Sequence, residues 1–217
     1  SNLSRSFHRS NRNVHSSLKT ETMIQVHKGV KLSRTKVKNN ILKMWGESTQ
    51  DDRHDWYNDA NSWCSENSKG YTSAQAAGVV AALSPVKRWD QNLICAQDMI
   101  NTNDCGHMGQ FKEKARNILK SDGSDEAILD ILNGRKISSF YLNFRYPDKA
   151  NSVTIDRHAL SIALGHKVTD LEYSGMTARQ YAFFVECYTI AAAKVDVSPV
   201  LMQSTTWVYY RREGQYN

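Results

Sequence analysis

Two side chains in the C-terminal half of the sequence have the types and spacing of a nucleophile and its electrostatic partner. Lys136 lies in the segment EAILDILNGRKISSFYLNF, and Asp156 follows twenty positions later in VTIDRH. Lys136 is predicted in the first turn of a helix, where the positive helix end and the adjacent Arg135 favour the neutral amine. A neutral amine can attack a sugar carbon, and an ionised aspartate can stabilise a cationic sugar. Taken singly, Lys136 is more often a surface lysine at a helix start, and an ordinary helix cap is a frequent explanation for Asp156.

The segment around Lys136 predicts a helix, a tight turn at Asn133 and Gly134, and a second helix. Gly134 is expected to let the backbone turn sharply. Such a turn exposes the unpaired first amides of the second helix, which bind phosphate with the help of the helix dipole. Asn133, Gly134 and Arg135 are therefore candidate nucleic-acid contacts, although turns of this kind between helices are frequent.

The segment around Asp156 predicts a second helix start. Three β-branched residues precede Asp156, which is expected to cap a helix that ends at Gly165. An aspartate that accepts helix amides can stay ionised behind apolar neighbours. His158 in the same turn is a candidate phosphate contact, with a purely structural histidine as the alternative.

Two further segments carry candidate ligand contacts. In SPVKRWDQN, Ser84, Trp89 and Asn92 are predicted to line a pocket, with Trp89 stacking on a flipped base and Asn92 hydrogen-bonding to its edge. A tryptophan buried in the core is an equally good interpretation. Arg211 and Arg212 at the end of the last helix are candidate phosphate contacts, and a solvated helix end is the alternative.

The elements that must position these residues are all predicted to be helices. No convincing period-two alternation occurs, and only three prolines interrupt the chain, so the fold class is all-α. Residues 72–83 are almost wholly small and apolar, which predicts a central, closely packed helix. The other helices are predicted over residues 36–45, 51–67, 86–100, 111–120, 126–132, 135–144, 157–164, 177–195 and 200–212.

Charge divides the 217 residues into two parts. The net charge is +6, and residues 1–44 contain ten Lys or Arg against one acid, Glu21, which gives +9 there and −3 in the remainder. This predicts a basic, partly flexible N-terminal arm over residues 1–44 and a helical domain over residues 45–217. The basic balance favours an anionic partner, most commonly nucleic acid, and a solvated tail is the alternative for the arm.

Other features of the composition narrow the class of protein. No apolar run reaches the length of a membrane span, and the sequence lacks a secretory signal, so we expect a cytoplasmic protein without a membrane partner. The four cysteines are too dispersed for zinc or an iron–sulfur cluster, so we expect no metal and no cofactor. One compact domain with a DNA-binding face suggests a monomer.

Four segments together resemble the helix-hairpin-helix (HhH-GPD) superfamily of DNA glycosylases. Gly134-Arg135-Lys136 is similar to the end of that family's hairpin, and Ile155-Asp156-Arg157-His158 is similar to its Val-Asp-Thr-His motif. Upstream, Ala82-Leu83-Ser84 resembles its Leu-Leu-Ser segment, and residues 114–118 (KARNI) resemble its Lys-Ala-x-x-Ile segment. The order and spacing agree over residues 74–165, under half of the chain. The resemblance implies a helix-hairpin-helix glycosylase-like bundle with a basic N-terminal extension.

The sequence also departs from that pattern. The hairpin reads Leu132-Asn133-Gly134 in place of Leu-Pro-Gly-Val-Gly, and the iron–sulfur cysteines of some members are absent. The chain looks closer to a divergent, phage-associated branch that resembles α-glutamyl/putrescinyl thymine pyrophosphorylases. That branch is connected with hypermodified bases in phage DNA.

The resemblance implies an enzyme that flips a modified base, expected to be a hypermodified or glucosylated pyrimidine, out of double-stranded DNA and cleaves its N-glycosidic bond. Lys136 would attack C1′ or position the leaving base, and Asp156 would stabilise positive charge on the sugar. Strand cleavage would follow base loss if Lys136 is the nucleophile. Defence against phage with modified DNA is the expected context. The alternatives are a transferase that attaches an amino acid or polyamine to an activated thymine and a non-catalytic DNA-binding module.

Overall fold

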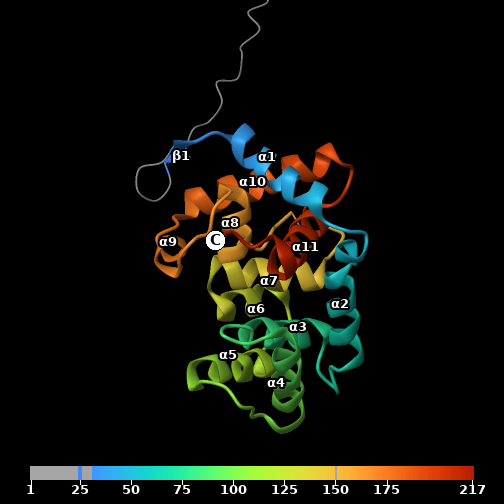
Figure 1. Ribbon diagram of the computed structural model, residues 1–217. Coiled ribbons are helices and arrows are strands. Elements are labelled where there is room, and N and C mark those ends of the chain that lie inside the picture. The colour runs from blue at the N-terminus through green and yellow to red at the C-terminus, as the bar shows by residue number, and fades with distance from the viewer. Residues whose placement is uncertain (1–23, 26–30, 150) are drawn as a thin grey trace, which may run out of the picture.

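A computed structural model describes residues 24–25, 31–149 and 151–217. Within these residues the chain is mostly helical, which confirms the all-α prediction (Figure 1). The described strands are β1 (Ile24–Gln25) and β2 (Lys31–Leu32), which pair antiparallel. Most of the predicted N-terminal arm, residues 1–23 and 26–30, lies outside the described residues.

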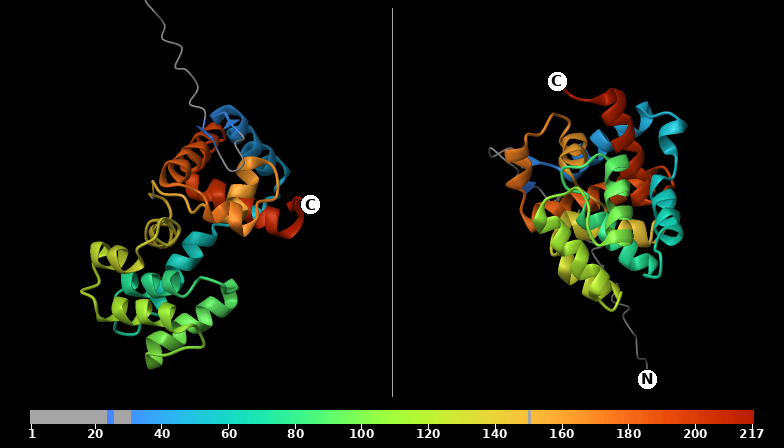
Figure 2. Two further views of the ribbon diagram at one scale, coloured as in Figure 1. Left: turned by 90° about the vertical axis from the view of Figure 1, so that its left-hand side faces the viewer. Right: turned by 90° about the horizontal axis from the view of Figure 1, so that it is seen from below.

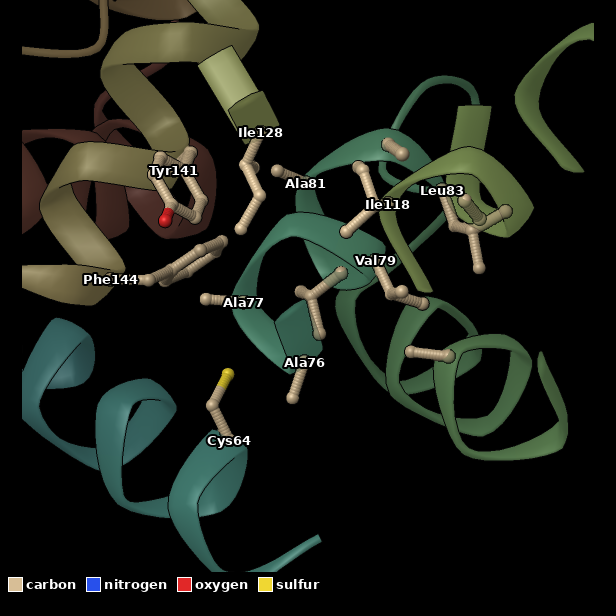
Figure 3. Packing of buried hydrophobic residues seen from close by; sticks show 14 of the residues in the cluster. Cys64, Ala76, Ala77, Val79, Ala81, Leu83, Ile118, Ile128, Tyr141 and Phe144 are labelled. Atoms are coloured by element: carbon tan, nitrogen blue, oxygen red, sulfur yellow. The ribbon is translucent and has the colours of Figure 1, made fainter. Parts of the chain in front are cut away.

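One group of helices forms a continuous hydrophobic core around α3 (Ser73–Ala82). Every residue of α3 from Ala74 to Ala82 is buried, as its small apolar composition predicts. The surrounding helices are α2 (Trp56–Glu66), α4 (Trp89–Thr102), α5 (Gly109–Lys120), α6 (Asp125–Leu132) and α7 (Arg135–Arg145). Figure 3 shows side chains of α2, α5, α6 and α7 converging on α3.

Close packing around α3 depends on Gly78. A Cβ at this position would lie 2.8 Å from Cγ2 of Ile128 and 2.9 Å from Cγ2 of Ile118, both shorter than real Cβ contacts. The glycine therefore lets α5 and α6 pack directly against the backbone of α3. Because α6 is the first helix of the predicted hairpin, this contact fixes the hairpin against the core.

A second hydrophobic core combines the two ends of the described chain. It contains α1 (Arg34–Glu47), α8 (Arg157–Leu164), α10 (Ala178–Lys194) and α11 (Pro199–Tyr209). The predicted boundary after residue 44 falls inside α1, whose Val37, Ile41, Met44 and Trp45 are buried in this core. The stretch of basic sequence in α1 is thus one face of a packed helix.

The two cores form two lobes, which are visible in the left panel of Figure 2. Helix α11 belongs to both, because Val200 packs into the first core and Met202 into the second. A 3₁₀ turn, η2 (Asp51–Arg53), and the short helix α9 (Asp170–Ser174) complete the described elements, together with a π-helical segment, η3 (Tyr210–Gly214), that continues α11. Helix α9 was not predicted from the sequence.

The helix ends around the predicted site follow local chemistry. Oδ1 of Asp156 accepts a 2.8 Å hydrogen bond from the backbone amide of Ala159, and Gly165 ends α8 with a φ of 74°. Ser124 caps α6 by accepting from the amide of Ala127. The predicted cap at Asp156 is confirmed, and in both helices the N-cap side chain satisfies an amide that the helix leaves unpaired.

Candidate active site

A pocket of about 230 Å³ lies between the two lobes. Its volume is below the roughly 300–1,000 Å³ of pockets for drug-sized ligands, which suits a single ring system with small substituents. Lining residues come from α2, the loop before α4, α4, α7, the segment before α8, and α11. They are Trp56, Tyr57, Ser84, Lys87, Trp89, Asn92, Lys136, Ile137, Phe140, Thr154, Asp156, Gln203, Ser204, Trp207 and Val208.

Lys136 and Asp156 both line this pocket. Lys136 is the second residue of α7 and is half-buried, and it makes no hydrogen bond or ion pair with the residues that the structure describes. Its amine is therefore available to a ligand. The folded chain thus brings the predicted nucleophile and its predicted partner into one cavity.

The carboxylate of Asp156 is held by hydrogen bonds on both oxygens. Oδ1 caps α8, and Oδ2 accepts a 2.8 Å hydrogen bond from the indole Nε1–H of Trp207 on α11. Both donors interact with the charged form, and charge-assisted bonds of this kind are stronger than neutral ones. The carboxylate is therefore held in one orientation at the pocket wall.

The hairpin turn differs from the prediction in one respect. Asn133 has the left-handed conformation, with φ 46° and ψ 57°, whereas Gly134 is extended, with φ −169°. The prediction that Gly134 provides the sharp turn is wrong, because Asn tolerates the left-handed region and takes that position instead. Lys114 supports the turn by donating a 2.7 Å hydrogen bond from Nζ to the carbonyl of Leu132.

Gly134 nevertheless leaves the start of α7 open. It is the N-cap residue, without a side-chain cap, and an added Cβ would have only the Leu132 carbonyl oxygen within 4 Å, at 4.0 Å. The first amides of α7 therefore lack a capping side chain. Arg135, the next residue, donates from Nη2 to the carbonyl of Met176 at 3.1 Å, which ties the hairpin to the second lobe.

A chain of contacts links the end of α11 to the start of α8. Nη1 of Arg211 lies 3.0 Å from Nε2 of His158, and its guanidinium lies 5.4 Å from the ring of Trp207. Burial is the main cause that lowers the pKa of His158, and the nearby guanidinium groups of Arg211 and Arg157 add to it. A neutral His158 can accept a hydrogen bond at Nε2 from the guanidinium of Arg211.

Arg212 forms an ion pair with a buried residue of the same chain. Its Nη2 donates a 2.9 Å bond to Oδ2 of Asp52, a carboxylate that is only 3% exposed. The same carboxylate accepts from the amide and hydroxyl of Thr49. The two arginines predicted as phosphate contacts are therefore not equivalent, since Arg212 pairs with a buried acid and Arg211 contacts His158 and Trp207.

The predicted base-pocket residues Ser84, Trp89 and Asn92 all line the cavity. The ring centroids of Trp89 and Trp56 are 4.3 Å apart with a 57° interplanar angle, so both rings belong to an aromatic cluster. Ser84 donates to the carbonyl of Ala81 at 2.8 Å. Asn92 is buried at 2% exposure, and its Oδ1 has no hydrogen-bond partner in the described part of the chain.

Several lining residues were not predicted as site residues from the sequence. Trp207 is one of them, and its contact with Asp156 joins residues 51 positions apart. Lys87 and Trp56 also line the pocket, and Lys87 donates from Nζ to the carbonyl of Gly106 at 2.7 Å. The polar and aromatic composition of SPVKRWDQN indicated a ligand-binding segment that includes Lys87. The sequence of α2 contained no comparable indication that Trp56 lines a pocket.

The arrangement combines an amine, an oriented carboxylate, aromatic walls and amide groups in one small cavity. No group of three or more metal-ligating side chains is found among the described residues. Cys64, Cys95 and Cys187 are buried and Cys105 is half-buried. In the part of the chain that the structure describes, no helix has the length and apolar character needed to cross a bilayer.

The chain belongs to a family of unknown function, DUF7178, whose model matches residues 23–214. Neither a curated protein nor a solved structure matches the chain.

Proposed function

We propose that this protein is a DNA glycosylase that flips a modified base, expected to be a modified pyrimidine, into the inter-lobe pocket and cleaves its N-glycosidic bond. The observation that carries the proposal is that Lys136 and Asp156, which lie on different helices, line one cavity of base-compatible size. The resemblance of the segments around these residues to the helix-hairpin-helix superfamily supports the same reaction. Defence against modified phage DNA is the context we propose.

The chemistry follows from the two side chains. As the base leaves with the electron pair of the glycosidic bond, positive charge develops on the sugar, and the Asp156 carboxylate stabilises it. The amine of Lys136 forms a bond to C1′ and, after loss of its protons and ring opening, a Schiff base. Water then hydrolyses the Schiff base, or strand cleavage precedes that hydrolysis.

Two features of the surface support binding to a DNA duplex. The first is the uncapped start of α7 at Gly134, where amides and the helix dipole favour a phosphate. The second is Val86, which is 81% exposed and lies between the pocket residues Ser84 and Lys87. Apolar side chains that enter the base stack fill the space left by a flipped nucleotide.

The backbone at Val86 is strained and firmly held. Val86 has a φ of 54°, which is an outlier for a β-branched residue, and such strain is typical of functional sites. Nε2 of His107 lies 3.1 Å from the carbonyl of Leu83 and 3.0 Å from that of Pro85. We propose that the rigid turn presents Val86 to DNA beside the pocket. We propose that the enzyme acts as a monomer.

The test incubates the protein with duplexes that carry normal, hydroxymethylated or glucosylated bases and measures released base and abasic sites. We expect release from one modified duplex, abolished by Asp156→Asn. Borohydride should trap a covalent protein–DNA adduct in the wild type but not in Lys136→Gln. Arg212→Gln is a control for general damage, because Arg212 lies outside the pocket lining.

Absence of release from all these duplexes would contradict the proposal for those bases. Base modification without abasic sites would favour the transferase, which attaches an amino acid or polyamine to an activated thymine. Binding to DNA that is unchanged by Asp156→Asn, without any chemistry, would favour a non-catalytic DNA-binding module.

A further inference from the structure

Asn92 is the clearest functional residue that the proposed reaction does not use. It lies on the first turn of α4, is 2% exposed and lines the pocket, and its Oδ1 makes no hydrogen bond within the described residues. An unsatisfied buried acceptor costs roughly 1–3 kcal/mol. A ligand in the pocket that Asn92 lines would complete this acceptor.

A second amide reaches the pocket from the other lobe. Oε1 of Gln203 on α11 accepts a 3.2 Å hydrogen bond from the hydroxyl of Tyr57. Burial raises the pKa of Tyr57, so this hydroxyl stays protonated and is a donor. The amide of Gln203 is thereby oriented, and its Nε2 makes no hydrogen bond to a described residue. The pocket therefore contains an unpaired acceptor on one wall and an unpaired donor on another.

We propose that Asn92 determines which base this pocket accepts: its Oδ1 receives an N–H from the ring or exocyclic amine of the base, while Nε2 of Gln203 donates to a ring or carbonyl acceptor. This inference rests on the proposed function. The ligand class is a planar heterocycle that carries a donor and an acceptor on its edge. The rings of Trp56, Trp89 and Trp207 provide aromatic surface for such a heterocycle.

The first test separates a functional asparagine from a structural one by thermal unfolding. Asn92→Leu keeps the branched shape and the number of side-chain heavy atoms and removes an unpaired oxygen, so we expect a melting temperature equal to or above that of the wild type. Asn143→Leu is the matched control, because Asn143 is equally buried but fully paired, donating to Ser152 at 2.7 Å and accepting from Thr154 at 2.8 Å. That variant should melt several degrees lower.

The second test measures ligand binding through the fluorescence of the pocket tryptophans. The probes are thymine with 3-methylthymine, and 5-hydroxymethylcytosine with its N4,N4-dimethyl derivative. We expect the wild type to bind at least one N–H form about tenfold or more tightly than its methylated counterpart. In Asn92→Leu the two members of that pair should bind alike, because the discriminating acceptor is gone.

The outcomes distinguish this inference from the proposed function. Equal binding of both members by the wild type, or no binding of any probe, would overturn the role of Asn92. A lowered melting temperature of Asn92→Leu, comparable to that of Asn143→Leu, would do the same. If Asn92→Leu still releases the base from DNA and Asp156→Asn does not, the proposed glycosylase activity is supported and the role of Asn92 is rejected. If Asn92 discriminates between the N–H and methylated probes but no base is released from DNA, the recognition site is supported and the glycosylase activity is rejected.

Discussion

The indole Nε1–H of Trp207 donates a 2.8 Å hydrogen bond to Oδ2 of Asp156 and so connects the last helix to the cap of α8. Oδ1 of the same carboxylate is occupied by the amide of Ala159. The charge of Asp156 is thus fixed in direction before any ligand enters. A preorganised charge of this kind needs no rearrangement when positive charge develops on a sugar.

Trp207→Phe keeps the aromatic packing and removes the hydrogen bond to Asp156. A hydrogen bond to a charged group contributes about 1.5–3 kcal/mol, so base release should slow by about tenfold or more under single-turnover conditions. DNA affinity should change little, since the indole N–H is already occupied by the carboxylate of Asp156. An unchanged rate of base release would show that Trp207 does not position Asp156.

Gly134→Ser should separate DNA binding from stability. Serine can adopt the extended backbone conformation of Gly134. Serine at an N-cap stabilises a helix more than glycine by only a few tenths of a kcal/mol, so the free energy of unfolding should be unchanged or slightly higher. The new hydroxyl would occupy amides of α7 that we assign to a phosphate, and DNA affinity should fall severalfold. Ser124→Gly at the start of α6 is the control, with lower stability and unchanged affinity. Measurements are fluorescence anisotropy with duplex DNA and thermal unfolding.

Val86→Gly should relieve backbone strain and impair base flipping. Relief of strain at a sparsely populated φ stabilises the fold by about 1–3 kcal/mol, whereas the greater chain entropy of glycine destabilises it by roughly 0.5–1 kcal/mol. The free energy of unfolding should therefore be equal or higher. Base release from a fully paired duplex should slow, and release from the same base opposite an abasic position should not, since that base is already unpaired. Equal slowing on both substrates would contradict a wedge role for Val86.

His158 should make stability depend on pH just below neutrality. Burial, assisted by the Arg211 and Arg157 guanidinium groups, lowers the pKa of His158 below its ordinary value of 6.5. As pH falls, His158 is therefore protonated in the unfolded chain before it is protonated in the folded one. The free energy of unfolding then decreases as pH drops from about 6.5 toward the lower pKa of His158 in the folded protein. His158→Gln should flatten this part of the curve of melting temperature against pH between 5 and 8. A wild-type curve that is already flat in that window would contradict the lowered pKa of His158.

Local chemistry in the sequence was sufficient for most of the helices. Asp156 before α8 and Gly165 after it define both ends of that helix, because a side-chain acceptor and a left-handed glycine satisfy backbone groups without help from distant residues. The central position of α3 follows from its small apolar side chains for a similar reason. The hairpin was predicted as a unit, but the choice of Asn133 over Gly134 for the left-handed residue was not, since both residue types adopt that conformation.

The tertiary structure decided which of these residues work together. The sequence by itself determined that Lys136 begins one helix and that Asp156 caps another, but a helix start has no local property that reveals its neighbour across a cleft. Trp207 reaches Asp156, and Arg212 reaches Asp52 across 160 positions, only because α11 packs against both lobes. Likewise, Oδ1 of Asn92 is unpaired because of the residues that surround it in the described part of the folded chain. Long-range packing, which local patterns do not encode, turned separate candidates into one pocket.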